Sequence, residues 1–381
     1  MNVVEFFAGA GGLAIGAERA GFEHEVALDF NADACNTLRQ NHKWNVIEQD
    51  VGSYQFDDLP LEPDLFAGGP PCQPFSTAGK HAADSDPRNR FPDVIRAIQR
   101  LRPKSFILEN VSGLLRKTWS EYVNYLIHQL QEPELPIRNS ESWYDHSSRL
   151  EDAYIGQIDV HRLRYQVHKH PVNAADYGVP QQRKRVIFIG FREDLGVRWA
   201  LPPATHSEES LLYSKWITGD YWREHGLSRP ICSDIELKKT MLALEQPELL
   251  KRERWRTVRD VLSDLGDPQI ENGLGRRHGH DFIAGARSYV GHTGSALDYP
   301  AKTIKAGVNG IGGGENMLLR EDGSVRYFTK LEMLRLQTFP DDYQLAGTRS
   351  SVIKQLGNAV PPHLAFLLTN SIKFALQRSV S

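Results

Sequence analysis

Residues 3–13 of this chain read Val-Val-Glu-Phe-Phe-Ala-Gly-Ala-Gly-Gly-Leu. The apolar run Val3–Phe7 predicts a buried first strand, and Leu13–Ala20 predicts a helix directly after it. The glycines between them let the backbone approach a ligand closely, while the start of the helix offers unpaired N–H groups. We therefore expect a ligand-binding turn at the carboxyl end of the first strand.

The same strand–helix order continues along the first half of the chain. It predicts an α/β fold with a doubly wound, mostly parallel, Rossmann-like sheet that carries helices on both faces. In such a sheet, ligands bind at the carboxyl ends of the strands. The other predicted strands are Glu25–Phe30, Val46–Val51, Asp64–Gly68, Ser105–Glu109, Arg164–His170 and Val186–Phe191. The other predicted helices are Ala32–Asn41, Phe91–Leu101 and Tyr122–Leu130.

Two regions depart from this alternation. Residues 132–159 are polar and rich in turn formers, which predicts a surface insertion. From Leu201 to about Asn316, glycines gather among scattered arginines and histidines, which predicts a separate, smaller and loop-rich domain. The last segment contains an apolar helical pattern over Lys354–Leu376 that we expect to pack on the first domain. The predicted organisation is a catalytic domain at 1–195, a small domain at 196–340 and a returning segment at 341–381.

The composition is that of a soluble globular protein. Of the 381 residues, 40% are hydrophobic and 24% are charged, and no apolar run reaches the roughly 18 residues of a membrane span. The three cysteines, Cys35, Cys72 and Cys232, lack the spacing of a disulfide framework or a structural zinc site. We therefore expect a cytoplasmic protein without a metal, and free thiols.

Charge alone does not identify a partner. The formal net charge is −3, and residues 251–305 carry ten Lys/Arg against seven Asp/Glu. This mild basic excess by itself is more typical of a solvated face than of a nucleic-acid groove.

The glycine-rich turn is consistent with several cofactors, because nucleotide, flavin and S-adenosylmethionine sites all use one. Its Gly-x-Gly-Gly spacing lacks the third glycine of the dinucleotide fingerprint. Asp29, at the end of the second strand, suits a ribose hydroxyl pair, and Asp50, after the third, could accept from an adenine amino group. Each of these two aspartates could equally cap a helix or a turn.

Residues 68–76 read Gly-Gly-Pro-Pro-Cys-Gln-Pro-Phe-Ser and follow the fourth strand. The two prolines fix the backbone before Cys72 and remove N–H donors, so the thiol stands on a rigid, non-helical platform. A lone cysteine is usually a small core residue. These neighbours favour an exposed nucleophile instead, which needs nearby cations or dipoles to form a thiolate near neutrality. The polar stretch Thr77–Arg90 that follows suits a mobile loop that closes over a polyanion.

Two further groups lie at strand ends. Glu109 leaves the buried run Phe106–Leu108, and burial of a carboxyl favours the neutral acid, so Glu109 can donate a proton at neutral pH. A capping or salt-bridged glutamate is the alternative. Arg183 and Arg185 are two residues apart, so on an extended segment they project to one side and could clamp a carbonyl or a phosphate. Without the other motifs, a solvated strand edge would explain these arginines.

Together these pieces resemble the DNA cytosine-C5 methyltransferases, of the bacterial restriction–modification type. The matching blocks follow one another in the family's order and lie toward both ends of the chain. Only the middle of the chain has no matching block. The matching blocks are Phe7–Leu13, Pro70-Pro71-Cys72-Gln73, Glu109-Asn110-Val111, Gln181-x-Arg183-x-Arg185, Arg326–Tyr343 and Gln355–Pro362.

The resemblance implies a reaction in which Cys72 adds to C6 of a flipped-out cytosine and S-adenosyl-L-methionine gives its methyl group to C5, leaving S-adenosyl-L-homocysteine. Cytosine C5 is a poor nucleophile, and the covalent addition activates it. Flipping costs a few kcal/mol of lost stacking. By resemblance, Glu109 engages N3 and the amino group, Arg185 supports O2, and Arg183 or Asn110 steadies Glu109.

The resemblance also assigns contacts to cofactor and DNA. The implied cofactor residues are Phe7, Ala8, Gly9, Gly11, Gly12, Leu13, Asp29, Phe30, Asp50, Val51, Gly69, Pro70, Asn358, Ala359 and Val360. The implied DNA contacts are Gln73, Ser76, Lys80, Arg88 and Arg90. By resemblance the middle region reads a specific double-stranded site, with arginine and histidine as candidates for guanine edges. We expect a monomer at the nucleoid, in the common setting of a cognate restriction endonuclease.

Three other functions are compatible with parts of the sequence. An RNA (tRNA) cytosine methyltransferase could use the same scaffold, but that branch has a shorter middle than the roughly 115 residues here. An inactive scaffold that binds cofactor or DNA would not need Cys72, Glu109, Arg183 and Arg185 intact. A nicotinamide dehydrogenase conflicts with the glycine spacing and with the proline–cysteine motif.

Overall fold

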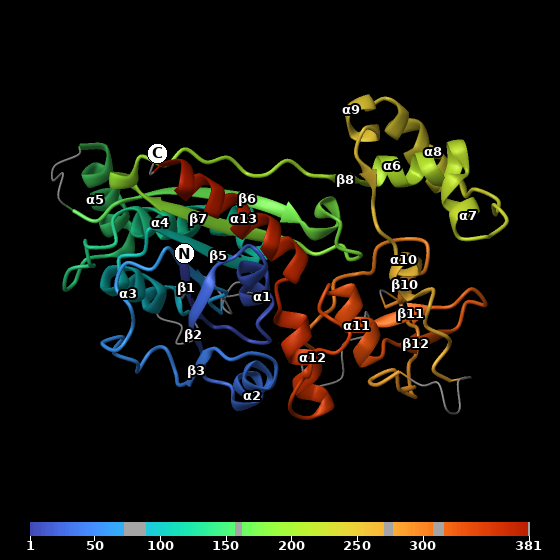
Figure 1. Cartoon of the computed structure of the whole chain (residues 1–381). Coiled ribbons are helices and arrows are strands. Elements are labelled where there is room, and N and C mark those ends of the chain that lie inside the picture. The colour runs from blue at the N-terminus through green and yellow to red at the C-terminus, as the bar shows by residue number, and fades with distance from the viewer. Residues whose placement is uncertain (72–88, 157–161, 270–276, 291, 308–315, 380–381) are drawn as a thin grey trace.

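The chain forms two lobes, one built on a large sheet and a smaller one of short helices and strands (Figure 1). This computed structural model describes residues 1–71, 89–156, 162–269, 277–290, 292–307 and 316–379.

The larger lobe is organised by a seven-stranded sheet in the order β3-β2-β1-β4-β5-β7-β6. Neighbours from β3 to β5 pair in parallel, and β7 runs antiparallel to both β5 and β6. The predicted mostly parallel sheet is therefore confirmed. The strands are β1 (Asn2–Phe6), β2 (Glu23–Asp29), β3 (Asn45–Glu48), β4 (Leu65–Gly68), β5 (Ser105–Val111), β6 (Tyr165–Asn173) and β7 (Lys184–Arg192).

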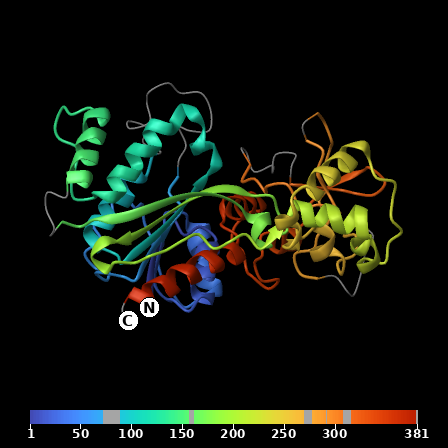
Figure 2. The same cartoon turned by 90° about the horizontal axis from the view of Figure 1, so that it is seen from above.

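Helices cover both faces of this sheet (Figure 2). Alternate residues of β1 show why: Val3 packs in the core beneath α1 and α13, whereas Val4 and Phe6 pack in the core beneath α3 and α4. The helices of this lobe are α1 (Gly12–Arg19), α2 (Ala32–Asn41), α3 (Phe91–Leu101), α4 (Ser120–Gln131), α5 (Trp143–Gly156), α12 (Arg349–Asn358) and α13 (Pro362–Ser379). Short 3₁₀ turns lie at Ser112–Leu115, Lys117–Trp119, Ala174–Tyr177 and Glu193–Leu195.

The supposed insertion at 132–159 contains the 14-residue helix α5, so the turn-rich expectation was wrong there. His146, Leu150 and Ala153 are buried, and the Tyr125 hydroxyl on α4 lies 2.9 Å from Nδ1 of His146. A stripe of this spacing is helical. The many polar residues on its outer face concealed the stripe.

The smaller lobe divides into a helical part and a strand part. The loop-rich expectation holds after α10, but residues 206–262 are largely helical. Its helices are α6 (Glu208–Tyr213), α7 (Asp220–Glu224), α8 (Asp234–Leu244), α9 (Pro247–Leu250), α10 (Val258–Leu262) and α11 (Lys330–Leu336), with a π-helical turn at Ser214–Thr218. Its strands are β8 (His206–Ser207), β9 (Glu253–Arg254), β10 (Ser295–Ala296), β11 (Met317–Leu319) and β12 (Val325–Tyr327). Among the described residues, no helix has both the length and the apolar character needed to cross a membrane.

The end of the chain returns to its beginning, because α13 lies along α1 (Figure 1). The helices approach so closely at Gly16 that a Cβ there would stand 2.3 Å from Cβ of Ala365 and 2.6 Å from the backbone nitrogen of Phe366. Leu364, Leu368 and Ile372 complete the buried face of α13. A glycine in α1 is therefore the condition for this close packing.

An ionisable pair lies buried beneath the first turn. Glu5 on β1 is 2% exposed, and its Oε2 lies 3.9 Å from Nε2 of His24, too far for a hydrogen bond. Burial, followed by the nearby charge of Asp29, raises the pKa of Glu5 well above its ordinary value. Burial, followed by His42, lowers the pKa of His24 to about 3. Both directions favour the neutral forms, so this pair is not a salt bridge near neutrality.

Gly16→Ala should destabilise the fold by about 1–3 kcal/mol, because the new methyl group would force α1 and α13 apart. Gly113→Ala is the matched control, since a Cβ at Gly113 meets nothing within 4 Å. The measurement is the free energy of unfolding in urea for both variants. Equal values for the two would show that the α1–α13 contact does not need a glycine.

Glu5→Gln should stabilise the protein near neutral pH, by on the order of 1–3 kcal/mol, because the amide needs no proton uptake on folding, whereas the buried carboxyl must be protonated at a pH where the unfolded chain would leave it ionised. The folded pKa of Glu5 is raised, so its contribution to stability is complete at acid pH and is lost as pH rises through the folded pKa. The gain of the variant over wild type should therefore grow from acid to neutral pH. Urea unfolding at several pH values measures it, and a pH-independent difference would contradict the buried-acid assignment.

Candidate functional site

The glycine-rich turn sits between β1 and α1, as the sequence predicted. Gly11 is in the left-handed region at φ +78°, where a side chain is strained, and its N–H donates to the Ala8 carbonyl at 2.8 Å. A Cβ at Gly12 would stand 2.0 Å from the carbonyl oxygen of Val360. The turn thus depends on glycine both for its shape and for its approach to the α12–α13 junction.

The carboxylate of Asp29 holds this turn by accepting hydrogen bonds from backbone N–H groups. Its Oδ2 accepts from the N–H of Gly9 at 2.8 Å, and its Oδ1 accepts from that of Asn31 at 2.9 Å. Burial raises the pKa of Asp29, and these backbone donors oppose that rise. The neighbouring side chain of Phe30 is 67% exposed at the strand end. An exposed aromatic ring beside a carboxylate and a glycine turn fits a nucleoside, whose base stacks and whose ribose hydroxyls donate.

Asp50 and Val51 follow β3 on the same edge of the sheet. Val51 is buried, whereas Asp50 accepts from the Gly52 N–H at 2.7 Å and pairs with Arg90 at 3.0 Å. Arg90 also pairs with Asp93 at 3.2 Å, on the first turn of α3. The structure thus places the expected DNA contact Arg90 beside the expected cofactor residue Asp50, with its charge balanced by two carboxylates.

Glu109 and Arg185 meet where β5 and β7 pair. Nε of Arg185 lies 2.6 Å from Oε1 of Glu109, and both side chains are nearly buried. A Cβ at Gly69 would stand 3.7 Å from Oε2 of Glu109, so the end of β4 borders this carboxylate. Asn110 donates from Nδ2 to the Pro70 carbonyl at 3.0 Å. The acid, its arginine and the Pro-Pro platform are thereby brought together at the edge of the sheet where β4 and β5 end and the antiparallel β7 begins.

Arg183 has a different environment from Arg185. It is fully buried and donates from Nη1 to the Ile304 carbonyl at 3.2 Å and from Nη2 to that of Gly357 at 2.9 Å. The side chain that contacts Glu109 is therefore Arg185, while Arg183 and Asn110 hold backbone carbonyls. This differs from the expectation that Arg183 or Asn110 steadies the glutamate. Local spacing could not show it, because both partners of Arg183 lie more than 100 residues away.

The junction between α12 and α13 supplies the last set of predicted cofactor residues. Ala359 and Val360 are buried, and Asn358 is exposed at the end of α12. Val360 contacts the first turn through the approach at Gly12. Of the remaining predicted residues, Cys72, Gln73, Ser76, Lys80 and Arg88 lie outside the described part of the chain.

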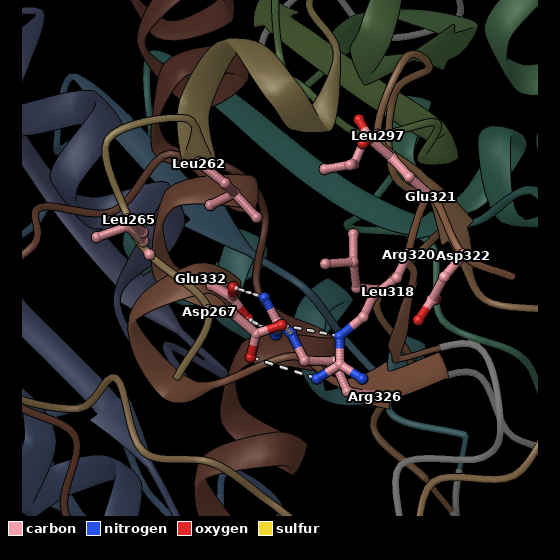
Figure 3. A pocket seen from close by; sticks show the side chains of 11 residues that line it. Leu262, Leu265, Asp267, Leu297, Leu318, Arg320, Glu321, Asp322, Arg326 and Glu332 are labelled. Atoms are coloured by element: carbon pink, nitrogen blue, oxygen red, sulfur yellow. Dashed lines mark hydrogen bonds and ion pairs between the residues drawn. The ribbon is translucent and has the colours of Figure 1, made fainter. Parts of the chain in front are cut away.

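In the smaller lobe, the ion pair between Arg326 and Glu332 lines one side of a cavity of about 400 Å³ (Figure 3). Arg326 donates to both carboxylate oxygens of Glu332 at 2.6 and 2.7 Å, and Glu332 closes a capping box with Thr329 at the start of α11. Arg320 pairs with Asp267 at 2.8 Å. Within the block Arg326–Tyr343, Arg326, Thr329 and Glu332 therefore have a structural role, because their contacts fix α11 to β12.

Sequence reasoning assigned no individual role to Tyr343, although it lies in that block. Its hydroxyl donates to the Ala10 carbonyl at 2.8 Å, within the glycine-rich turn. The only available signal was its position at the end of a matched block, because the two residues are 333 positions apart.

Comparisons with known proteins agree with this geometry. A family model described as C-5 cytosine-specific DNA methylase matches residues 1–134 and 155–374. The Type II methyltransferase M.NgoMIV of Neisseria gonorrhoeae is 30% identical over 390 residues, covering 98% of each chain. Two solved structures share the fold, each over 99% of both chains: an E. coli prophage protein titled a DNA modification methyltransferase (TM-score 0.60, 20% identity) and S. pombe Dnmt2 methyltransferase (TM-score 0.57, 16% identity).

Proposed function

This chain belongs to the C-5 cytosine-specific DNA methylase family and is a DNA cytosine-5 methyltransferase, and we propose that it works on a flipped-out cytosine of a specific duplex site through a covalent Cys72–C6 adduct. The observation that carries the proposal is the pairing of Glu109 with Arg185 beside Gly69 and Pro70. Cys72 directly follows the Pro70-Pro71 platform.

The chain's own residues supply the charge balance that the addition needs. Attack of the Cys72 thiolate on C6 forms a C–S bond and moves electrons toward N3 and O2 of the ring. Glu109 engages N3 and the amino group, and the guanidinium of Arg185, already 2.6 Å from that carboxylate, supports O2. Asn110 holds the Pro70 carbonyl and so keeps the thiol platform against this pair.

The completed reaction restores the enzyme. The activated C5 takes a methyl group, a base removes the C5 proton, and the C6–S bond breaks to release the Cys72 thiolate. S-Adenosylmethionine, when bound, supplies the methyl group as an electrophilic sulfonium. The glycine turn, Asp29 and the exposed ring of Phe30 fit this group, since they offer close backbone approach, an acceptor and a stacking surface.

The relatives guide the choice of substrate. M.NgoMIV is named a Type II methyltransferase, and its match spans the middle of this chain as well as both ends. This supports double-stranded DNA rather than RNA as the substrate, the smaller lobe as the reader of the site, and a cognate restriction endonuclease as the setting.

The function can be tested by expressing the gene in a host without DNA methylation and mapping 5-methylcytosine. One short motif methylated throughout the DNA is the expected result. Cys72→Ser is the matched control and should give no methylation while binding S-adenosylhomocysteine like wild type, because the hydroxyl is a far weaker nucleophile. Unmodified DNA with the wild-type gene would exclude DNA as the substrate, and methylated tRNA would then select the RNA alternative.

DNA that carries 5-fluorocytosine at the mapped position should trap the enzyme, because fluorine cannot leave as the C5 proton does. We expect a complex that survives denaturing electrophoresis with wild type and does not form with Cys72→Ser. If the complex dissociates in denaturant, the covalent adduct is wrong even when methylation is seen.

A further inference from the structure

The underside of the glycine-rich turn rests on residues far away in sequence. A Cβ at Gly11 would stand 2.7 Å from Leu38 Cδ2 on α2, 3.2 Å from the Tyr343 hydroxyl and 3.6 Å from the Trp44 ring. These side chains therefore form a floor directly beneath the turn. Of the three, Tyr343 is the one that also bonds to the turn, through the Ala10 carbonyl.

Tyr343 is held in place by the segment that follows it. The N–H of Gln344 donates to Oδ1 of Asn41, and Nδ2 of Asn41 donates back to the Gln344 carbonyl at 2.7 Å. The N–H of Ala346 donates to the hydroxyl of Thr37 at 2.9 Å. Three hydrogen bonds to α2 thus fix the backbone beside Tyr343, so its hydroxyl meets the turn from a defined position.

The surroundings keep the hydroxyl a hydrogen-bond donor. Tyr343 is 4% exposed, and burial raises its pKa above the ordinary value. His42 Nε2 lies 3.3 Å from the hydroxyl, and burial lowers the pKa of His42 to about 4, so its ring is neutral near pH 7. Trp44 stacks on the His42 ring with centroids 3.6 Å apart.

Groups that are distant in sequence therefore fix the turn at Gly9, Ala10 and Gly12. Asp29 holds the N–H of Gly9, Tyr343 holds the carbonyl of Ala10, and Val360 blocks any side chain at Gly12. The Asp29 contact comes from the adjacent strand. The other two contacts come from the last 40 residues of the chain.

We propose that Tyr343 is a positioning residue for the methyl donor: its hydroxyl fixes the Ala10 peptide so that the turn is pre-formed to receive the cofactor. This inference rests on the proposed function of the turn as the S-adenosylmethionine site. Pre-forming a binding loop lowers the ordering cost of binding and therefore improves affinity. Tyr343 itself lies beneath the turn and takes no part in the chemistry at C5 or C6.

Tyr343→Phe removes only the hydroxyl, and we expect S-adenosylhomocysteine to bind about 3- to 10-fold more weakly, because the bond to the Ala10 carbonyl is lost together with the longer contact to His42 Nε2. The KM for S-adenosylmethionine should rise by a similar factor with kcat unchanged. Tyr177→Phe is the matched control, because this buried hydroxyl also donates to a backbone carbonyl, that of Pro202, at 3.1 Å. Calorimetric titration of the full chain gives the affinities, and steady-state rates give KM and kcat.

The outcomes separate the inference from the function. If both tyrosine variants bind S-adenosylhomocysteine like wild type, Tyr343 is merely structural and the inference is wrong, while the proposed function stands. If wild type does not bind S-adenosylhomocysteine at all, the cofactor assignment itself fails. Asn41→Ala provides a second route should Tyr343→Phe fold poorly. It releases Gln344 from α2 at a half-buried position and should weaken binding about 2-fold, and unchanged affinity would again overturn the inference.

Discussion

One buried guanidinium, carried by the segment that leads into β7 of the large sheet, contacts the smaller lobe and the end of α12 at once. Arg183 stands just before β7 and donates to the Ile304 carbonyl on one side and the Gly357 carbonyl on the other. A Cβ at Gly357 would stand 2.2 Å from the backbone nitrogen of Ala306, so the two segments are already in close contact there. A buried arginine is costly unless its donors are satisfied. The sheet, the smaller lobe and α12 must therefore meet in one arrangement for Arg183 to be accommodated.

That arrangement also sets the relation between the two halves of the site. Arg185, two residues after Arg183, reaches Glu109 on β5, while Gly357 is three residues before Val360, which contacts the glycine turn. The Glu109–Arg185 pair and the glycine turn are thus both positioned by segments that contact Arg183. A shift of the smaller lobe against the sheet would therefore strain the Arg183 contacts. The arrangement of the Glu109–Arg185 pair and that of the glycine turn therefore depend on the same packing around Arg183.

Much of the larger lobe could be predicted from the sequence, because β1, β4 and β5 are short buried runs and the helices α1, α2, α3 and α4 have their own periodicity. Glycines and a Pro-Pro-Cys string at strand ends then located the candidate site, and Glu109 and Arg185 do meet. Other features were hidden. The stripe of α5 lies among polar residues, and the single helical pattern over Lys354–Leu376 is two helices, α12 and α13, because the backbone at Ala359 is extended and Pro361 and Pro362 follow. The partners of Arg183 and the bond from Tyr343 to Ala10 join segments separated by more than 100 residues, and no local pattern encodes such contacts.

The return of α12 and α13 to α1 has a consequence for biosynthesis. The glycine turn leaves the ribosome well before its partners, since Tyr343 follows Ala10 by 333 positions and Val360 and the face of α13 that packs on Gly16 follow later still. A nascent chain therefore carries an unfinished turn until those residues have been synthesised, and contacts of such large sequence separation form late and slowly. Interrupted chains, even those that contain every residue from the first strand through α11, would lack the Tyr343 and Val360 contacts that complete the turn. The order of synthesis thus ties the full assembly of the turn to the arrival of α12 and α13.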